Sequence, residues 1–390
     1  MNSGTIGALV IGGDYQGLGI VRSLGRQGVP VGVVDDEASI CRYSHYTTFS
    51  ERLPSLRDPA NTFRLLLDIA ERRSLHGWVL YPTRDETVAT LSHYRSELCR
   101  FYRVPTPNGQ TIQWFWDKRK TYELASQLGI PVPHTWYVQD AKDLDQFDGR
   151  FPVALKPAIK EHFIYATRAK AWRADNLSQL RKLFNRACQF MPSDEIMIQD
   201  IIPGDGSRQY AYCCFFKQNQ PIASLVTCRR RQHPLEFGRA STYVESVALP
   251  CLEETSQRFL RAANYYGLVE MEYKQDPRDG QHKLLDANAR TWGYNSIGRA
   301  AGVDFPYLLF SDQLNEQISP RRGKVGVRWI RLLTDVPTGV IAVMKGELKC
   351  LDYIRSLRDI SEEAVFSNED PLPGLVELVL APYLFIKRGF

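Results

Sequence analysis

The sequence predicts a multidomain chain of mixed class, α/β at its start and α+β further on. Residues 6–11 form a short apolar run that enters the glycine-rich turn Gly12 to Gly19, and a helical pattern and a second apolar run ending in Asp35 follow. Strand, glycine turn, helix and strand in this order are typical of a parallel α/β unit. Between residues 209 and 248 alternating segments replace the helical pattern, which predicts antiparallel strands and a change of domain type.

The composition is that of an ordinary globular protein. Of the 390 residues, 44% are hydrophobic and 24% are charged, and this length allows two or three domains with cores of their own. The formal charge of +5 is modest and no basic run extends beyond Arg229 to Arg231, so we expect no nucleic-acid partner. The eight cysteines form no Cys-x-x-Cys pair, and no segment resembles a signal peptide or a membrane-spanning helix. We therefore expect a cytoplasmic protein with no membrane partner.

The ends of two early strands provide candidate ligand contacts. The glycine turn after residue 11 could place backbone N–H groups and a helix N-terminus beside an anion. Its spacing does not match G-x-G-x-x-G, so a structural or substrate-binding turn is favoured over NAD binding. A strand at residues 78–81 ends in a polar segment, where Thr83, Arg84 and Asp85 are candidate substrate contacts. For Asp85, capping of the next helix is the favoured alternative.

Two strand-like runs, Gly267 to Lys274 and Leu284 to Gly293, predict a β-hairpin. Alternate side chains of a strand share a face. The polar members of these faces are Glu270 and Glu272 on the first run and Asp286, Asn288 and Arg290 on the second. Clustered carboxylates are unfavourable without a cation, and oxygen ligands of this kind suit Mg²⁺. The alternative is a hairpin whose charges face water.

A lysine inside an apolar strand is a further candidate. The run Phe151 to Pro157 predicts a buried strand with Lys156 near its end. An unpaired buried ammonium group is costly, so we expect Lys156 to have an anionic partner or ligand.

Three blocks of the sequence, in this order and spacing, resemble the ATP-grasp superfamily. The resemblance is to the carboxylate–amine ligase type, similar to D-aspartate ligase and the large subunit of carbamoyl-phosphate synthetase, and it covers residues 5–315. The blocks are Asp117-Lys118 with Gly129-Ile-Pro-Val-Pro133, Phe151 to Lys156, and Leu284 to Arg290. The resemblance implies ATP clasped between a middle and a C-terminal domain. The implied divisions are a Rossmann-like domain at residues 1–110, a small domain with a linker helix at 111–205, a large antiparallel-sheet domain at 206–320, and an extension at 321–390.

The resemblance also implies nucleotide contacts. Lys118 and Lys156 match two lysines that contact the phosphates of ATP. Gln199 lies where the superfamily usually has a glutamate at the adenine hinge, and the backbone from Asp200 to Ile202 is implied to bind the adenine edge.

The hairpin residues match the metal and catalytic positions of the superfamily. Asp286 and Asn288 match a metal-binding acid and amide, and Arg290 matches the arginine that stabilises an acyl phosphate. The partner acid is either Glu270 or Glu272, and alignment of the strand start favours Glu270.

The sequence departs from the superfamily pattern after Lys156. A glycine-rich phosphate loop is expected there, yet residues 157–166 contain no glycine. The side chains of Lys160, His162 or Lys170 could replace its backbone contacts.

The basic segment Cys228 to Gly238 resembles a loop of D-aspartate-ligase-like members. Arg229 and Arg231 are expected to share a strand face, where they could hold the γ-phosphate or a substrate carboxylate. We assign Arg229 to ATP binding and Arg231 to catalysis. A solvated strand end is the alternative.

The implied activity is that of an ATP-dependent carboxylate–amine ligase, which forms an amide through an acyl phosphate and releases ADP and phosphate. The implied cofactors are ATP and one or two Mg²⁺, with Mn²⁺ as a substitute. The implied partners are a small carboxylate and an amine, such as an amino acid or peptide, and a homodimer is considered. The alternatives are a bicarbonate-using carboxylase or carbamoyl-phosphate-type enzyme and a non-catalytic nucleotide-binding module.

Overall fold

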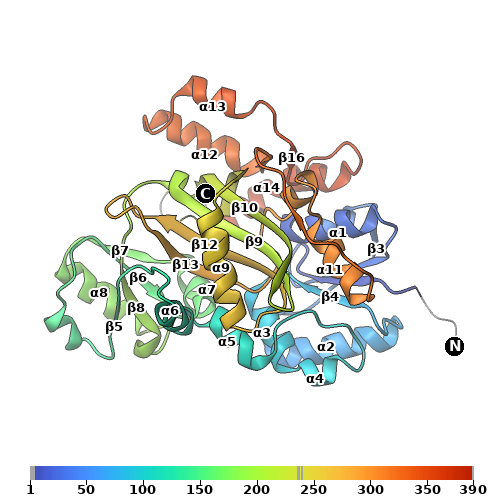
Figure 1. The fold of residues 1–390 in the computed structure, drawn as a ribbon, viewed down its shortest axis with the longest axis horizontal. Coiled ribbons are helices and arrows are strands. Elements are labelled where there is room, and N and C mark those ends of the chain that lie inside the picture. The colour runs from blue at the N-terminus through green and yellow to red at the C-terminus, as the bar shows by residue number, and fades with distance from the viewer. Residues whose placement is uncertain (1–4, 235–237, 239, 389–390) are drawn as a thin grey trace.

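The computed structural model describes residues 5–388 apart from residues 235–237 and 239, and it contains three sheets. The first domain and the small domain lie at opposite ends of the molecule, and a large sheet lies between and above them (Figure 1). A chain of mixed α/β class with parallel and antiparallel sheets, as predicted from the sequence, is confirmed.

The first domain is a parallel sheet with helices. Its strands are ordered β3-β2-β1-β4. They are β1 (Ala8–Ile11), β2 (Val31–Asp35), β3 (Thr47–Arg52) and β4 (Val79–Pro82). The accompanying helices are α1 (Tyr15–Gly25), α2 (Pro59–Arg72), α3 (Asp85–His93) and α4 (Arg95–Leu98).

The glycine turn between β1 and α1 is held by the first domain itself. Gly12 has φ +100°, and a Cβ there would collide with the hydroxyl oxygen of Thr83. The carboxylate of Asp35 accepts a hydrogen bond from the N–H of Gly13 at 2.6 Å and pairs with Arg84 at 2.7 Å. These contacts support the structural interpretation of the turn.

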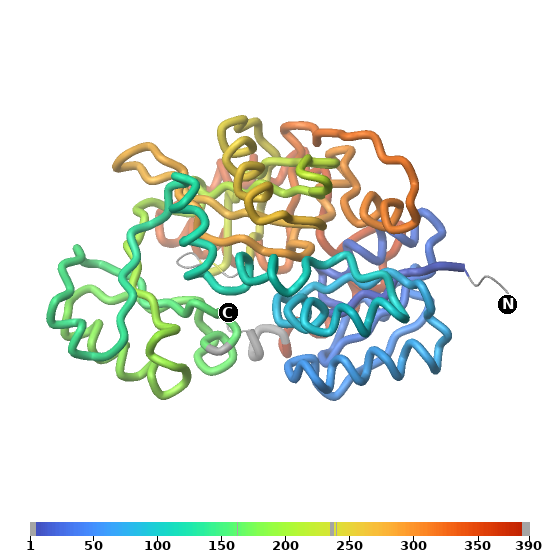
Figure 2. The backbone as a smooth tube through the Cα atoms, turned by 60° about the horizontal axis from the view of Figure 1, so that its bottom comes forward, coloured from blue at the N-terminus to red at the C-terminus, as the bar shows by residue number. Residues whose placement is uncertain are grey.

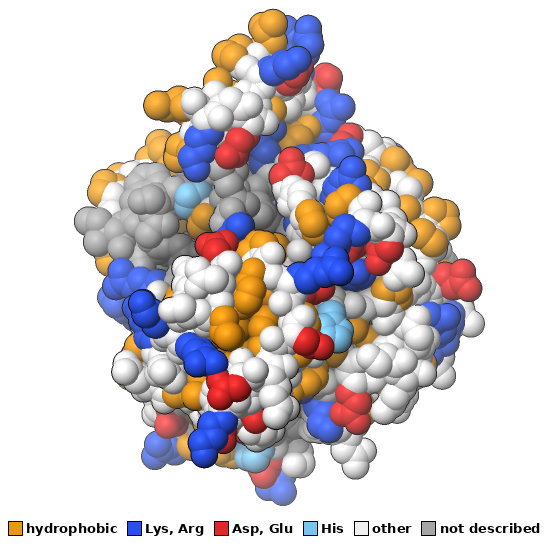
Figure 3. Space-filling model, turned by 90° about the vertical axis from the view of Figure 1, so that its left-hand side faces the viewer, with side chains coloured by type: hydrophobic (Ala, Val, Ile, Leu, Met, Phe, Trp, Pro, Cys, Tyr) orange, Lys and Arg blue, Asp and Glu red, His pale blue; other side chains and the backbone are white. Residues whose placement is uncertain are grey.

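The small domain is an antiparallel sheet ordered β5-β8-β6-β7. Its elements are β5 (Thr135–Tyr137), β6 (Val153–Pro157), α7 (Lys160–Thr167), β7 (Trp172–Ala174), α8 (Leu177–Ala187) and β8 (Ile196–Asp200). Two helices, α5 (Gly109–Trp116) and α6 (Lys118–Gln127), lead into it from the first domain. On the face of this domain shown in Figure 3, basic and acidic side chains are interspersed.

The large sheet has eight strands, in the order β13-β12-β9-β10-β11-β15-β16 with β14 beside β10. Its first five strands are β9 (Gln209–Lys217), β10 (Gln220–His233), β11 (Ala240–Val247), β12 (Gly267–Gln275) and β13 (His282–Asn288). The helices of this region are α9 (Pro250–Ala262), α10 (Ile297–Ala300) and α11 (Phe305–Gln313).

The chain after residue 320 adds further strands to this large sheet. The sheet therefore extends beyond residue 320, where the resemblance implied that the large domain ends. It adds β14 (Arg321–Arg322), β15 (Arg328–Ile330) and β16 (Glu362–Glu363), together with α12 (Leu332–Met344), α13 (Cys350–Ser356) and α14 (Leu372–Arg388). A buried ion pair of 2.6 Å joins Arg331 to Glu377 of α14, and another of 2.9 Å joins Arg22 of α1 to Asp370. In the described residues, no helix is long and apolar enough to cross a membrane.

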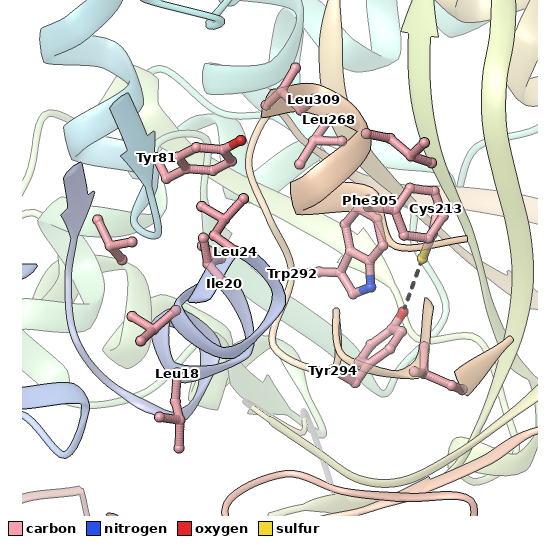
Figure 4. Close-up of a cluster of buried hydrophobic side chains, with 14 of the residues drawn as sticks. Leu18, Ile20, Leu24, Tyr81, Cys213, Leu268, Trp292, Tyr294, Phe305 and Leu309 are labelled. Atoms are coloured by element: carbon pink, nitrogen blue, oxygen red, sulfur yellow. Dashed lines mark hydrogen bonds between the residues drawn. The ribbon is translucent and has the colours of Figure 1, made fainter. Parts of the chain in front are cut away.

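A shared core fixes the first domain against the large sheet. Leu18, Ile20 and Leu24 of α1 belong to one buried cluster with Trp292 and Phe305, whose ring centroids are 4.9 Å apart (Figure 4). Trp292 lies in the segment that follows the end of β13 at Asn288, so this packing anchors the end of the predicted hairpin on the first domain.

Candidate active site

Residues of the first domain, the small domain and the large sheet together line a cleft of about 1390 Å³. In the tube view of Figure 2, the small domain at the left and the first domain at the right both lie below the large sheet. The cleft lining includes Thr83 to Glu86 of the first domain, Lys156 and Lys160 of the small domain, and Glu272 and Asp286 of the large sheet.

Strands β12 and β13 form the predicted hairpin. They pair with Glu270 opposite Asn288 and Glu272 opposite Asp286, and the register shifts by one residue after Glu272. The amide nitrogen of Asn288 donates hydrogen bonds to Glu272 at 3.1 Å and to Glu270 at 3.3 Å. The shared face of these side chains is therefore confirmed.

The two glutamates of β12 have different environments. Glu270 is 4% exposed and accepts a hydrogen bond from the hydroxyl of Tyr294 at 2.6 Å, and burial together with the charge of Glu272 raises its pKa to about 7. Glu272 lines the cleft and pairs with Arg229 at 2.9 Å. Burial opposes ionisation of Glu272, but Arg229 and Lys170 outweigh it and lower its pKa to about 2. An ionised acid facing the cleft is the better cation ligand, so the geometry favours Glu272 and not Glu270.

Glu272, Asp286 and Asn288 have the chemistry of a magnesium site. Mg²⁺ typically uses one or two protein carboxylates and completes its shell with substrate phosphates and water. In the described residues, no group of three or more His, Cys, Asp and Glu side chains is placed to hold a metal by itself. Two carboxylates and an amide therefore fit an ion that arrives with phosphates.

Two lysines approach the hairpin from the small-domain side. Lys118, the first residue of α6, forms an ion pair with Asp286. Lys156 of β6 donates a hydrogen bond to the hydroxyl of Tyr122 at 2.8 Å, and that hydroxyl donates to the carbonyl of Leu285 at 2.9 Å. The hydrogen-bond partner of Lys156 is therefore a hydroxyl. Among the described residues, no carboxylate makes the direct contact with Lys156 that the sequence led us to expect. Burial accordingly lowers its pKa to about 8.

Asp85 connects the first domain to the hairpin. It is the first residue of α3 and a first-turn acid of that helix, as the alternative interpretation expected, although Arg84 and not Asp85 occupies the N-cap position. Its carboxylate pairs with Arg290 at 2.9 Å and with Lys160 of α7. Arg290 also donates to Asn288 at 3.2 Å. Sequence reasoning named Asp85 and Arg290 separately, and no spacing signal links residues so far apart.

Arg229 and Arg231 do not share a face, which corrects the prediction. A β-bulge at this point gives β10 an extra residue, so Arg229 pairs with Val244 and Arg231 with the adjacent Tyr243. Arg229 contacts Glu272, whereas Arg231 binds Asp335 of α12 through two hydrogen bonds of 2.9 and 2.8 Å. An extra residue reverses the side-chain alternation of a strand. A catalytic role for Arg231 stays a prediction that this geometry does not favour.

The Arg231–Asp335 pair is expected to hold the C-terminal helices on the large sheet. Removing one partner of a buried ion pair typically costs about 3–5 kcal/mol, so Asp335→Asn should markedly lower the denaturation midpoint. The matched control is Glu245→Gln, which breaks the more exposed Arg230 pair and should cost about 1 kcal/mol or less. Equal midpoints for the two variants would contradict the assignment.

Known proteins match this chain in sequence. D-aspartate ligase of Enterococcus faecium (strain Aus0004) is 24% identical over 325 residues, which cover 78% of this chain and 76% of that protein. The carbamoyl phosphate synthase large chain, C-terminal section, of Methanopyrus kandleri is 23% identical over 335 residues, covering 82% of this chain and 55% of that protein. No protein-family model matches the chain.

Solved structures match the fold. The L-amino acid ligase from Bacillus licheniformis has a TM-score of 0.62 at 14% identity, covering 80% of this chain and 75% of that one. N5-carboxyaminoimidazole synthetase from Staphylococcus aureus complexed with ADP has a TM-score of 0.63 at 15% identity, covering 84% and 82%. The chain has the ATP-grasp fold.

The end of β8 carries the residues that we expect at an adenine hinge. Gln199 is buried and its amide donates to the hydroxyl of Thr135 at 2.8 Å. The N–H of Asp200 donates to the carbonyl of His134 at 3.0 Å, and the carbonyl of Ile202 accepts from Lys274 at 2.8 Å. With these groups engaged, the carbonyl of Asp200 and the N–H of Ile202 are the expected contacts for an adenine edge.

In this ATP-grasp chain the helix α7 replaces the expected glycine-rich loop. It begins at Lys160, whose ammonium group lies 3.4 Å from the amide oxygen of Asn288. Lys170, beyond the helix, donates to the carbonyl of Gly238 at 3.2 Å, and burial lowers its pKa to about 8. The side chain of His162 lies outside the described residues. Side chains thus approach the phosphate region where the superfamily uses backbone.

The low pKa of Lys156 predicts pH-dependent nucleotide binding by this ATP-grasp protein. Only the ammonium form attracts phosphates, and with a pKa of about 8 that form prevails below pH 8 and is lost above it. We expect ATP affinity to be level on the acid side of this pKa and to fall by up to about tenfold per pH unit on the alkaline side. Calorimetric titration measures it. Lys156→Ala should bind ATP weakly and with a smaller alkaline loss, which leaves only the part due to Lys170, whose pKa is also about 8. A wild-type affinity that stays level would contradict the prediction.

Proposed function

We propose that this chain is an ATP-dependent carboxylate–amine ligase. The observation that carries the proposal is the convergence of Glu272, Asp286, Asn288 and Arg290 with two lysines on one cleft. Such a site matches a reaction in which phosphate is transferred and no side chain becomes a covalent nucleophile.

The reaction has two steps. The substrate carboxylate attacks the γ-phosphorus of ATP, giving an acyl phosphate and ADP. An amine then attacks the acyl carbon, the C–O bond to phosphate breaks, and an amide and phosphate are released.

Each residue set has a distinct role in these steps. Lys118 and Lys156 would bind the phosphates of ATP, and Arg229 would offset the charge of the γ-phosphate. Bound Mg²⁺, one or two ions replaceable by Mn²⁺, would neutralise charge on the transferring phosphoryl group. Arg290 would orient the acyl phosphate through a planar guanidinium that suits carboxylate and phosphate oxygens.

The substrates we propose are a small carboxylic acid and a small amine, amino acids or short peptides. The relatives named as D-aspartate ligase and L-amino acid ligase support this class. We also propose that the protein is cytoplasmic, in keeping with its eight free cysteines, and that it forms a homodimer, as a related biotin carboxylase domain does.

Hydroxylamine trapping tests the proposed function. Hydroxylamine intercepts acyl phosphates as hydroxamates, so the test does not require the natural amine. Wild-type protein with ATP, Mg²⁺ and a panel of amino acids including D-aspartate should form a hydroxamate and ADP in equal amounts. ADP release with bicarbonate as the sole acid would favour the carboxylase alternative. ATP binding without ADP release under any acid would favour the non-catalytic module.

A further inference from the structure

Glu161 is a buried carboxylate of the cleft that the proposed steps do not use. It is the second residue of α7, it lines the cleft, and it is 8% exposed. It occurs in the segment where this chain departs from the superfamily, so its role cannot be taken from the expected glycine-rich loop.

The neighbouring carboxylates of the cleft all have partners. Asp85 pairs with Arg290 and Lys160, and Glu86 accepts a hydrogen bond from the hydroxyl of Tyr165. Glu272 and Asp286 pair with Arg229 and Lys118. Within the described part of the chain, the Glu161 carboxylate accepts a hydrogen bond from its own backbone N–H and none from a side chain. Glu161 therefore has its hydrogen-bonding capacity available for a ligand.

The charges around Glu161 come from two elements. Burial raises its pKa to about 7, Lys160 on its own helix opposes the shift, and Asp85 and Glu86 of α3 add to it. A carboxylate of this kind can accept a proton and release it again near neutral pH.

Glu161 is adjacent in the chain to Lys160, which shares an ion-pair partner with Arg290. It follows Lys160, whose ammonium group contacts the same Asp85 carboxylate as Arg290. Glu161 and Arg290, the arginine expected at the acyl phosphate, thus lie at the two ends of one network, in which Asp85 pairs with both Lys160 and Arg290. Two reactants bound on the two sides of this network would be adjacent.

We propose that Glu161 binds the ammonium group of the amine substrate and takes its proton before the amine attacks the acyl phosphate. This rests on the proposed function and names the chemical class recognised, a primary ammonium group. One proton passes from the ammonium nitrogen to the Glu161 carboxylate. The nitrogen lone pair then forms the C–N bond as the C–O bond breaks, and the second N–H proton leaves with the phosphate.

Two nucleophiles that differ in their need for a base test this role. Hydroxylamine is largely neutral at neutral pH, whereas the amine of an amino acid is protonated. We expect Glu161→Gln to lower amide formation from an amino acid mixture by about 100-fold or more, and to change hydroxamate formation by less than about threefold. Glu123→Gln, an exposed substitution on α6, is the control and should change neither rate.

The outcomes separate this role from a structural one. Equal losses with both nucleophiles, or no loss with the amino acids, would overturn the proposal. Glu161→Asp, which keeps the carboxylate and guards against misfolding, should form more amide than Glu161→Gln, and equal rates would also overturn it. A wild-type protein that forms no hydroxamate would instead refute the proposed function, because that step precedes any role of Glu161.

Discussion

Asp286→Asn should lower kcat by about a thousandfold, because metal-assisted neutralisation is worth several kcal/mol in a transition state. Asp286 lies opposite Glu272 on the paired strand and contacts Lys118, so its charge serves both the cation site and the phosphate-binding lysine. Asparagine keeps the shape and removes the charge. A coupled assay of ADP release measures the effect.

The control for this substitution lies on the same hairpin. Asp279→Asn removes a carboxylate at the exposed turn, where Asp279 pairs with Lys283, and should leave kcat near the wild-type value. Raising the Mg²⁺ concentration should recover part of the activity of Asp286→Asn. A rate for Asp286→Asn equal to that of Asp279→Asn would show that the metal assignment is wrong.

Arg290→Lys should lower kcat by about a thousandfold, the lower end of the effect of an arginine that stabilises a phosphoryl transition state. The guanidinium of Arg290 donates to Asp85 at 2.9 Å and to Asn288 at 3.2 Å, a fork that a lysine ammonium cannot reproduce. ATP binding should be nearly unchanged, since the nucleotide contacts lie on other residues. Steady-state kinetics and calorimetry separate the two effects.

The matched control is an arginine outside the cleft. Arg299→Lys affects a partly exposed pair between α10 and Glu362 of β16 and should leave kcat unchanged. If Arg290→Lys weakens ATP binding and leaves kcat intact, Arg290 is a nucleotide contact and not an acyl-phosphate contact.

The sequence correctly predicted the features that depend on the alternation of side chains along a strand. The pairing of β12 with β13 places Glu272, Asp286 and Asn288 together because alternate side chains of each strand share a face, and a bulge between Glu272 and Tyr273 shifts the register on the side of the turn. The parallel first sheet followed from its strand and helix order for a similar reason.

The sequence did not predict the features that depend on a single inserted residue or on a contact between residues far apart in the chain. The bulge in β10 separates Arg229 from Arg231, and a single inserted residue leaves no clear pattern in the sequence. The choice of Glu272 over Glu270 depends on burial by Tyr294, a residue that lies 24 positions further along the chain. The contact of Asp85 with Arg290 joins two domains, and nothing in the local pattern of either residue indicates it.

Transfer of ¹⁸O from the carboxylate substrate to phosphate tests the acyl-phosphate account most directly. The carboxylic acid identified by hydroxamate formation is labelled with ¹⁸O in both carboxyl oxygens and supplied with ATP, Mg²⁺ and an amine. One labelled oxygen bridges carbon and phosphorus in the intermediate and leaves with phosphorus when the amine attacks. We predict released phosphate that carries one ¹⁸O atom for each amide formed. Unlabelled phosphate, formed together with ADP and amide, would contradict the account.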